Sequence, residues 1–109
     1  MKKIFLLLFS IFFAMSCYTQ VIVKQFNADW NKSNSVTWLS KLTDCSVKYY
    51  DISKNPNLQK QYRVVVVPTI IVFQDGEEIK RYQADISFKM SATRSEIQEA
   101  IDEAIMGGF

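Results

Sequence analysis

The pairing demands of four strand-like runs constrain the fold of this chain more than any other feature of its sequence. Residues 69–73 form a β-branched run, and an Asp-Gly dipeptide at residues 75–76 separates it from a second run at residues 79–83. This arrangement favours a tight hairpin with antiparallel strands. The earlier runs, residues 21–26 and 47–52, are joined through a segment with helical spacing and therefore call for parallel pairing. A sheet that satisfies both connections is mixed.

Two helices are expected between these strands. The spacing of Val36, Leu39 and Leu42 predicts a helix that ends by about residue 43, with Ser35 as its N-cap. Residues 55–62 begin with Asn-Pro, which is typical of an N-cap followed by proline at the first helical position. This second helix is expected to be short.

The last helix carries the clearest pattern. Thr93 and Glu96 have the spacing of a capping box, and Gly-Gly at residues 107–108 ends the helix. Its apolar face consists of Ile97, Ala100, Ile101, Ala104 and Ile105. The resulting order, βαβα and then ββα, predicts an α/β domain with a mixed four-stranded sheet and helices on both faces.

The first sixteen residues have the pattern of a secretory signal peptide. Lys2 and Lys3 precede an apolar run at residues 4–15, and the small residue Ser16 follows it. The run is shorter than the about 20 apolar residues that a transmembrane helix needs. We therefore expect a signal peptide at residues 1–16 and a domain at residues 17–109, with an uncleaved anchor as the alternative.

Cys17 follows the expected cleavage point and is a candidate for lipid attachment. Ala14 to Cys17 reads Ala-Met-Ser-Cys, which is similar to a bacterial lipobox except that leucine is usual at its first position. A diacyl or triacyl anchor would hold the domain at a membrane surface. The alternative is that Cys17 is removed with the signal or left at the terminus. Either outcome predicts export, to a periplasmic, membrane-anchored or extracellular location.

The composition excludes several kinds of function. Of 13 basic residues, Lys2 and Lys3 lie in the expected signal, so 11 remain against 11 acidic residues. A neutral domain without a basic patch is a poor nucleic-acid binder. The chain has no histidine and two cysteines, which excludes histidine-based catalysis and most zinc sites. No metal or cofactor is expected.

Three short motifs in this order resemble those of the thioredoxin family. They are Phe-Asn-Ala-Asp-Trp at residues 26–30, Val-Pro-Thr at residues 67–69 and Phe-Gln-Asp-Gly-Glu at residues 73–77. The resemblance covers about residues 21–106 and implies a thioredoxin-like fold. The chain departs from the family by starting almost at the central strand, so that the amino-terminal strand and helix of a full-length thioredoxin are mostly absent.

The resemblance also locates a degenerate active site. Thioredoxins carry Trp-Cys-x-x-Cys where this chain has Trp30 to Asn34, and both cysteine positions, Asn31 and Asn34, hold asparagine. Gln25 stands where many thioredoxins have a buried aspartate. Dithiol exchange needs a low-pKa thiolate and a resolving thiol, and an amide supplies neither. The chain is therefore expected to have lost this reaction and not to act as an enzyme.

The family resemblance implies that a binding edge remains. In thioredoxins the proline that matches Pro68 is cis, and the backbone of the preceding residue, here Val67, pairs with an extended peptide. Trp30 and Thr69 flank this edge and complete the expected site for a protein or peptide partner. The alternative is that Pro68 shapes the loop and Trp30 serves packing.

Two other functions stay open at this stage. Cys45 is a candidate lone thiol for a degenerate oxidoreductase with an external reductant, and its simpler interpretation is a small apolar residue. The domain is also a candidate part of a larger envelope assembly. The absent amino-terminal strand exposes a sheet edge that another chain or a second copy would cover, and the oligomeric state is left open.

Overall fold

Four strands form one mixed sheet in the computed structural model, which describes residues 20–107. The strands are β1 (Val21–Asn27), β2 (Ser46–Asp51), β3 (Thr69–Gln74) and β4 (Glu77–Gln83). Their order across the sheet is β2-β1-β3-β4. β1 pairs with β2 in parallel, whereas β3 is antiparallel to both β1 and β4. The expected mixed four-stranded sheet is confirmed.

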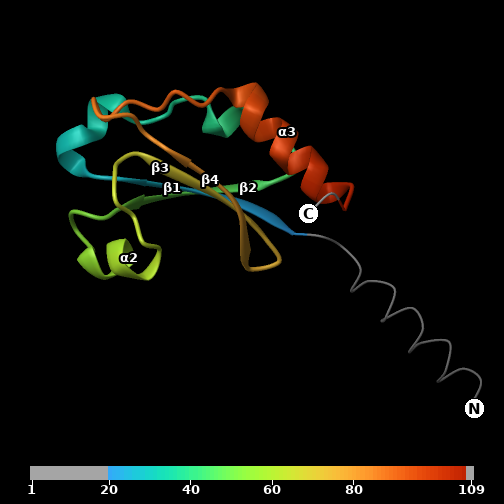
Figure 1. Ribbon diagram of the computed structural model, residues 1–109, viewed down its shortest axis with the longest axis horizontal. Helices are drawn as coiled ribbons and strands as arrows, with labels where there is room; N and C mark the ends of the chain where they lie inside the picture. The colour runs from blue at the N-terminus through green and yellow to red at the C-terminus, as the bar shows by residue number, and fades with distance from the viewer. Residues whose placement is uncertain (1–19, 108–109) are drawn as a thin grey trace, which may run out of the picture.

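Helices cover both faces of this sheet, as the element order predicts (Figure 1). The α-helix α2 (Pro56–Gln61) lies on one face. The α-helix α3 (Arg94–Ile105) and two 3-10 helices, η2 (Asp29–Asn34) and η3 (Leu39–Lys41), lie on the other. The hairpin between β3 and β4 has positive φ at both Asp75 (51°) and Gly76 (87°), the conformation that an Asp-Gly turn adopts.

The sheet separates two clusters of buried apolar side chains. On the α3 face the cluster consists of Val21, Val23, Val36, Leu39, Leu42, Ile70, Val72, Ile97, Ile101 and Ala104. On the α2 face it consists of Phe26, Ala28, Ile52, Val64, Val67, Ile71 and Phe73. Burial of one such large aliphatic side chain stabilises the fold by about 1.5–3 kcal/mol. Residues 20–107 thus contain a hydrophobic core on each face of the sheet.

The amphipathic pattern of α3 is confirmed with one exception. The backbone N–H of Glu96 donates to Thr93 Oγ1 at 3.2 Å, which is the N-cap that the sequence predicts. Ile97 and Ile101 are fully buried, but Ile105 in the last turn is 44% exposed. The apolar face of α3 therefore contacts the sheet only up to Ala104.

The prediction of a helix over residues 36–43 is wrong. This segment contains only η3, three residues long, and Ser35 has extended backbone angles after η2 rather than the role of an N-cap. Val36, Leu39 and Leu42 are still buried, because their three-residue spacing also fits a 3-10 turn. The stretch is rich in serine, threonine and valine, which favour an α-helix weakly.

The expectations for the amino terminus lie outside the described residues. They are the signal peptide at residues 1–16 and the lipid candidate Cys17. Among the helices of residues 20–107, none is long and apolar enough to cross a membrane.

Candidate functional site

The two asparagines at the expected cysteine positions lie in η2, directly after β1. Asn31 is only 4% exposed, although asparagine is usually found at the surface. Asn34 is half-buried, and its Nδ2 donates to Asn31 Oδ1 at 2.8 Å. The degenerate motif is therefore a packed polar element of the domain.

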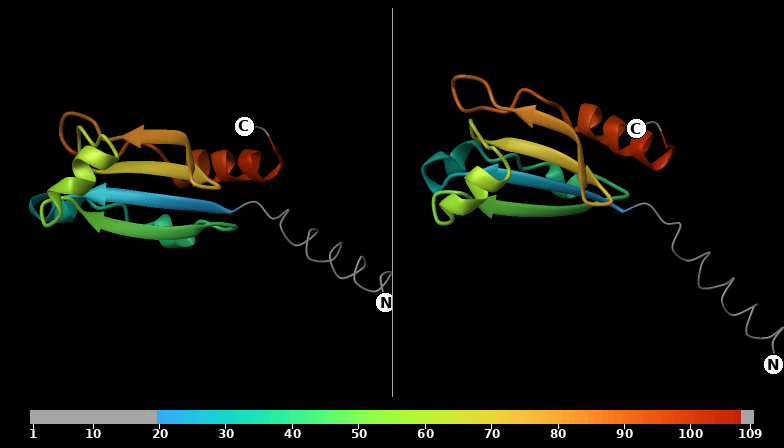
Figure 2. Two further views of the ribbon diagram at one scale, coloured as in Figure 1. Left: turned by 90° about the horizontal axis from the view of Figure 1, so that it is seen from below. Right: turned by 60° about the horizontal axis from the view of Figure 1, so that its bottom comes forward.

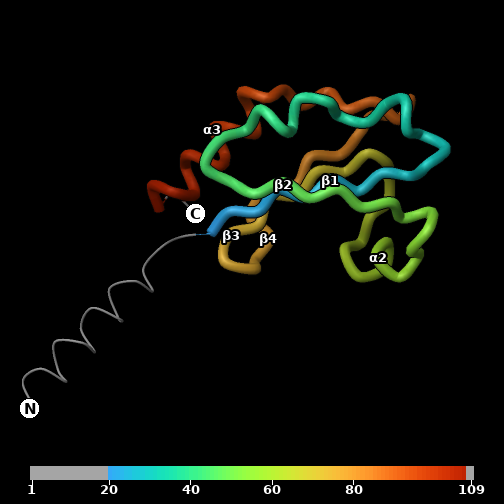
Figure 3. The backbone as a smooth tube through the Cα atoms, turned by 180° about the vertical axis from the view of Figure 1, so that it is seen from behind, coloured from blue at the N-terminus to red at the C-terminus, as the bar shows by residue number. Residues whose placement is uncertain are grey.

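The side-chain amide of Asn31 connects three distant segments. Its Nδ2 donates to the carbonyl oxygen of Val67 (3.3 Å), to that of Phe88 (3.2 Å) and to Asn27 Oδ1 (3.1 Å). The two amide hydrogens are thus shared among three acceptors. These bonds join the end of β1, the residue before Pro68 and the loop after β4, and the tube view shows that loop beside η2 (Figure 3).

Asn27 completes the polar network from the end of β1. Its Nδ2 donates to the carbonyl oxygen of Asn31 at 3.1 Å and to Ser35 Oγ at 2.8 Å. Amide side chains neither ionise nor act as nucleophiles at ordinary pH. The network therefore holds the site in shape and supplies no thiol chemistry.

The surroundings of this network also lack the features that activate a thiol. η2 is a 3-10 helix, and Ser35 after it is extended, so no α-helix begins at the motif. A helix N-terminus is one of the elements that lower a thiol pKa. Gln25 is 3% exposed, and its Oε1 accepts from the Val36 N–H at 2.9 Å, so this position binds the backbone and carries no charge.

The expected binding residues around Pro68 are mostly covered. The peptide bond between Val67 and Pro68 is cis. Val67 is 4% exposed, Thr69 is fully buried, and the Thr69 hydroxyl donates to the Val66 carbonyl at 2.6 Å. The Val67 carbonyl oxygen accepts a hydrogen bond from Asn31 Nδ2, so of the two backbone groups expected to pair with a peptide only the N–H remains. Val67, Pro68 and Thr69 are therefore buried beneath the surface.

A hollow of about 190 Å³ has Val67 in its floor, whereas Pro68 and Thr69 do not line it. It is lined by Ala28, Trp30, Ile52, Ser53, Gln59, Val64, Val65, Val66, Val67 and Phe88. Trp30 is 65% exposed, Val65 78% and Phe88 40%. The rings of Trp30 and Phe88 meet edge to face with centroids 5.2 Å apart. The expected site residue Trp30 therefore lies in an exposed apolar rim, together with two residues that the sequence analysis missed.

Phe88 reaches this rim through an unusual backbone conformation. Its φ is +63°, which is rare for a bulky side chain and persists only where neighbouring contacts impose it. The Phe88 N–H donates to the Asp85 carbonyl, and Asp85 Oδ1 accepts from the N–H groups of Ser87 and Lys89. The Asp-x-Ser turn at residues 85–87 is the sequence signal that would have drawn attention to this loop.

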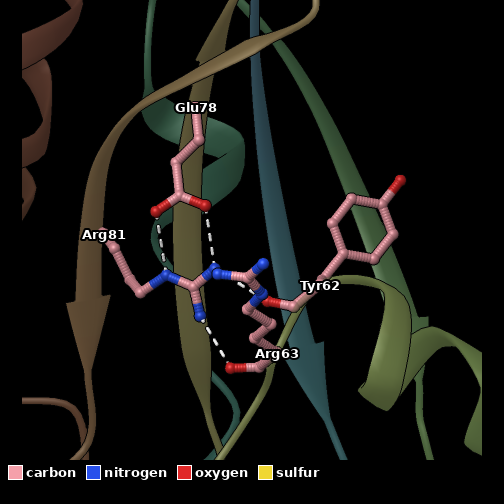
Figure 4. A network of polar contacts seen from close by, with 4 residues as sticks. All are labelled: Tyr62, Arg63, Glu78 and Arg81. Carbon is pink, nitrogen blue, oxygen red and sulfur yellow. Dashed lines mark hydrogen bonds and ion pairs between the residues drawn. The ribbon is translucent and has the colours of Figure 1, made fainter.

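Arg81 on β4 fixes the segment that leads into the hollow. Its guanidinium donates to both carboxylate oxygens of Glu78 at 2.8 and 2.9 Å, and to the carbonyl oxygens of Tyr62 (2.7 Å) and Arg63 (3.0 Å), as Figure 4 shows. Arg63 has a φ of +54° and directly precedes Val64 in the wall of the hollow. The wall is therefore anchored to the sheet by one side chain.

Cys45 lies apart from the hollow. It is half-buried and packs against the core cluster of the α3 face. Burial, with a smaller contribution from the neighbouring Asp44 carboxylate, raises the pKa of the Cys45 thiol. A lone-thiol oxidoreductase needs the opposite shift, because the thiolate is the reacting form.

Within residues 20–107 no group of three or more cysteine, aspartate or glutamate side chains is placed to hold a metal ion. The strongest features of the site are therefore its apolar rim and its amide network.

Comparisons with known proteins agree with the fold. No family model matches the chain. Over 41 residues it is 39% identical to thioredoxins of Mycobacterium tuberculosis and Mycobacterium bovis, which is 38% of this chain and 35% of each relative. The chain thus matches about a third of the length of these relatives.

Solved structures extend the likeness to most of the chain. A thioredoxin mutant from Halobacterium salinarum superposes with a TM-score of 0.62 and 26% identity, over 79% of this chain and 74% of that one. A malaria-parasite thioredoxin-2 gives a TM-score of 0.62 and 22% identity, over 78% and 84%. These likenesses, with the observed sheet order, show that the chain has a thioredoxin-family fold.

Proposed function

We propose that this chain is an exported thioredoxin-like module that binds an extended protein or peptide segment at the hollow beside Pro68, without dithiol exchange. The observation that carries the proposal is the exposed apolar rim of Trp30, Val65 and Phe88. Exposed apolar side chains that gather around a hollow mark interaction sites more often than single exposed ones do.

The backbone of the wall supports an extended partner. No group within the described residues accepts a hydrogen bond from the N–H of Val65, Val66 or Val67. An extended peptide presents carbonyl oxygens along its length and can satisfy such donors while its side chains enter pockets. The hollow of about 190 Å³ is small for a drug-sized ligand, for which pockets of about 300–1,000 Å³ are usual, and fits one apolar side chain.

The proposed location rests on the sequence. The basic start, the short apolar run and Ser16 favour export, and Cys17 is the proposed lipid attachment point if the domain is held at a membrane. A binding module at that surface needs no cofactor.

The binding test uses fluorescence from Trp30. The chain has two tryptophans, so Trp38→Phe leaves Trp30 as the reporter. Unstructured ten-residue peptides that differ only in one central residue, leucine, phenylalanine, serine or aspartate, are titrated into residues 18–109. We expect a blue shift and saturable binding for the two apolar peptides only.

A matched pair of variants distinguishes binding at this site from non-specific binding to exposed apolar side chains. Val65→Asp puts a charge in the rim, whereas Met106→Asp makes the same change at an 81% exposed residue after α3. Val65→Asp is expected to weaken binding about tenfold or more, and Met106→Asp to leave it unchanged. Equal weakening by both variants, or no binding by any peptide, contradicts the proposal.

A further inference from the structure

Strand β2 forms an open edge of the sheet. It pairs with β1 on one side, and no strand among residues 20–107 lies on its other side (Figure 2). Tyr49 in the middle of β2 is 54% exposed. An open edge presents a row of backbone donors and acceptors to any strand that can align with it.

The hydrogen bonds of β2 identify which of its residues face outward. The N–H of Ile52 donates to the Asn27 carbonyl at 2.9 Å, and Asn27 is in register with Asp51. In a parallel pair, alternate residues of a strand direct their N–H and C=O to the same neighbour. The even-numbered residues of β2 therefore pair with β1, whereas Val47, Tyr49 and Asp51 direct their backbone groups outward. Within the described residues these groups have no partner.

The other edge of the sheet, β4, is better protected against pairing with another strand than β2 is. Four of the seven residues of β4 are charged, namely Glu77, Glu78, Lys80 and Arg81. An irregularity also interrupts the pairing of β3 with β4 between Val72 and Phe73. Charges and bulges are the usual means of blocking an edge. β2 has fewer charged residues, Lys48 and Asp51, and an uninterrupted register with β1, so it is the less protected edge.

We propose that β2 pairs antiparallel with β2 of a second copy of this chain, with the two-fold axis at Tyr49. Val47, Tyr49 and Asp51 are symmetric about Tyr49. In this register Tyr49 lies opposite Tyr49, and Val47 lies opposite Asp51 of the second copy. If the axis lay at any other residue, at least one of Val47, Tyr49 and Asp51 would not lie opposite an outward-facing residue of β2 in the second copy.

The proposed register also brings one favourable pair of side chains together. Val47 packs on the α3 face and Tyr50 on the α2 face, so the side chains of Lys48 and Tyr50 share the α2 face. The proposed register places Lys48 opposite Tyr50 of the second copy, which is a favourable cation–π pair.

The interface is small. Six residues from each copy form the ladder, compared with about 20–30 residues a side in a standard stable interface. We therefore expect a reversible dimer with a dissociation constant on the order of 10–100 µM, which two copies on one membrane surface would favour.

Disulfide trapping tests the register. Residues 18–109 contain both core clusters, and Cys45→Ser removes the remaining native thiol of this fragment. In this background Tyr49→Cys places two thiols in a hydrogen-bonded pair with Cα atoms about 5.5 Å apart, within disulfide reach. Lys48→Cys puts the matching thiols about 7 Å apart along the strand, too far for a bond. Covalent dimer from Tyr49→Cys and little from Lys48→Cys is expected.

Sedimentation velocity over a range of concentrations tests the dimer without cross-linking. Tyr49→Lys places two like charges at the axis and is expected to abolish association. Gln83→Lys adds the same charge at the exposed end of β4 and should leave association unchanged. Circular dichroism confirms that each variant is folded. A monomer at every concentration, equal trapping at positions 48 and 49, or a dimer that persists in Tyr49→Lys overturns the proposal. A full chain that stays monomeric while residues 18–109 dimerise also overturns it, because the chain's own amino terminus would then cover the edge.

Discussion

The Nδ2 atom of Asn31 lies 3.3 Å from the carbonyl oxygen of Val67, and this hydrogen bond links the first cysteine position of the thioredoxin motif to the residue before Pro68. In this chain an amide occupies the position and binds both the floor of the hollow and the Phe88 loop. The Asn31 amide therefore holds together segments that are far apart in the sequence.

Asn31→Asp is expected to destabilise the domain strongly. The substitution keeps the shape of the side chain but replaces the amide donor by a carboxylate that faces the Val67 and Phe88 carbonyl oxygens in a buried place. Loss of the bonds and burial of an unpaired charge should lower the free energy of unfolding at neutral pH by about 3 kcal/mol. Urea denaturation followed by circular dichroism measures this.

Asn34→Asp is the matched control for that substitution. Asn34 is half-buried and makes one side-chain bond, to Asn31, so its carboxylate can turn toward water. Its cost should stay below about 1 kcal/mol. Similar costs for both variants would mean that the Asn31 bonds contribute little.

Arg81→Lys is expected to loosen the wall of the hollow. Lysine cannot reproduce the planar fork that binds Glu78 and the carbonyl oxygens of Tyr62 and Arg63 together. The free energy of unfolding should fall by about 1–2 kcal/mol, and amide exchange at Arg63 and Val64, whose N–H groups are hydrogen-bonded, should become faster. Lys80→Ala, an exposed change on the same strand, should alter stability by less than about 0.5 kcal/mol. Unchanged exchange at Arg63 and Val64 in Arg81→Lys would count against the anchoring role.

Cys45 is expected to be an unreactive thiol. Because burial raises its pKa, alkylation by iodoacetamide at pH 8 should be slower than that of a free cysteine and should still be rising above the ordinary thiol pKa of about 8.5. Disulfide turnover by residues 18–109 with an external reductant should equal the background, with or without Cys45→Ser. Turnover that disappears in Cys45→Ser would restore the lone-thiol oxidoreductase as the function.

Stability is expected to change little between pH 5 and pH 8. The chain has no histidine, the side chain whose ordinary pKa lies in that interval. A hydrogen bond from the Ser87 hydroxyl, with backbone N–H groups, lowers the pKa of Asp85, and the Ser53 hydroxyl does the same for Asp51. Carboxylates with a lowered folded-state pKa stabilise the fold above their ordinary pKa of about 3.9, and this contribution is lost as the pH falls through the folded-state values.

Thermal unfolding from pH 8 to pH 2.5 measures this dependence. The midpoint should be flat down to about pH 5 and should fall below about pH 4. Asp85→Asn should reduce the fall of the midpoint below about pH 4 and should make the loop that contains Phe88 more mobile. A midpoint that changes steeply between pH 5 and pH 8 would contradict the expectation.

The sequence by itself determined the order of the elements, the mixed sheet, the hairpin and the capped helix α3. These features depend on signals that act within a few residues, such as the Asp-Gly turn and the Thr93 cap. The segment at residues 36–43 was the exception, because three-residue spacing fits both an α-helix and a 3-10 turn. There the local preference for an α-helix is weak, and the packing of Val36 and Leu39 in the core of the α3 face decided the conformation.

Only the tertiary structure decided the character of the site. Asn31 contacts Val67 and Phe88 across 36 and 57 positions of sequence, and such contacts follow from the β2-β1-β3-β4 order and not from any local pattern. The same order makes β2 an open edge and places Val65 beside Trp30 at one hollow. The sequence could show that the cysteines were missing. Because hydrogen bonds depend on where the strands bring side chains together, only the folded chain could show that Asn31 had become the centre of a polar network.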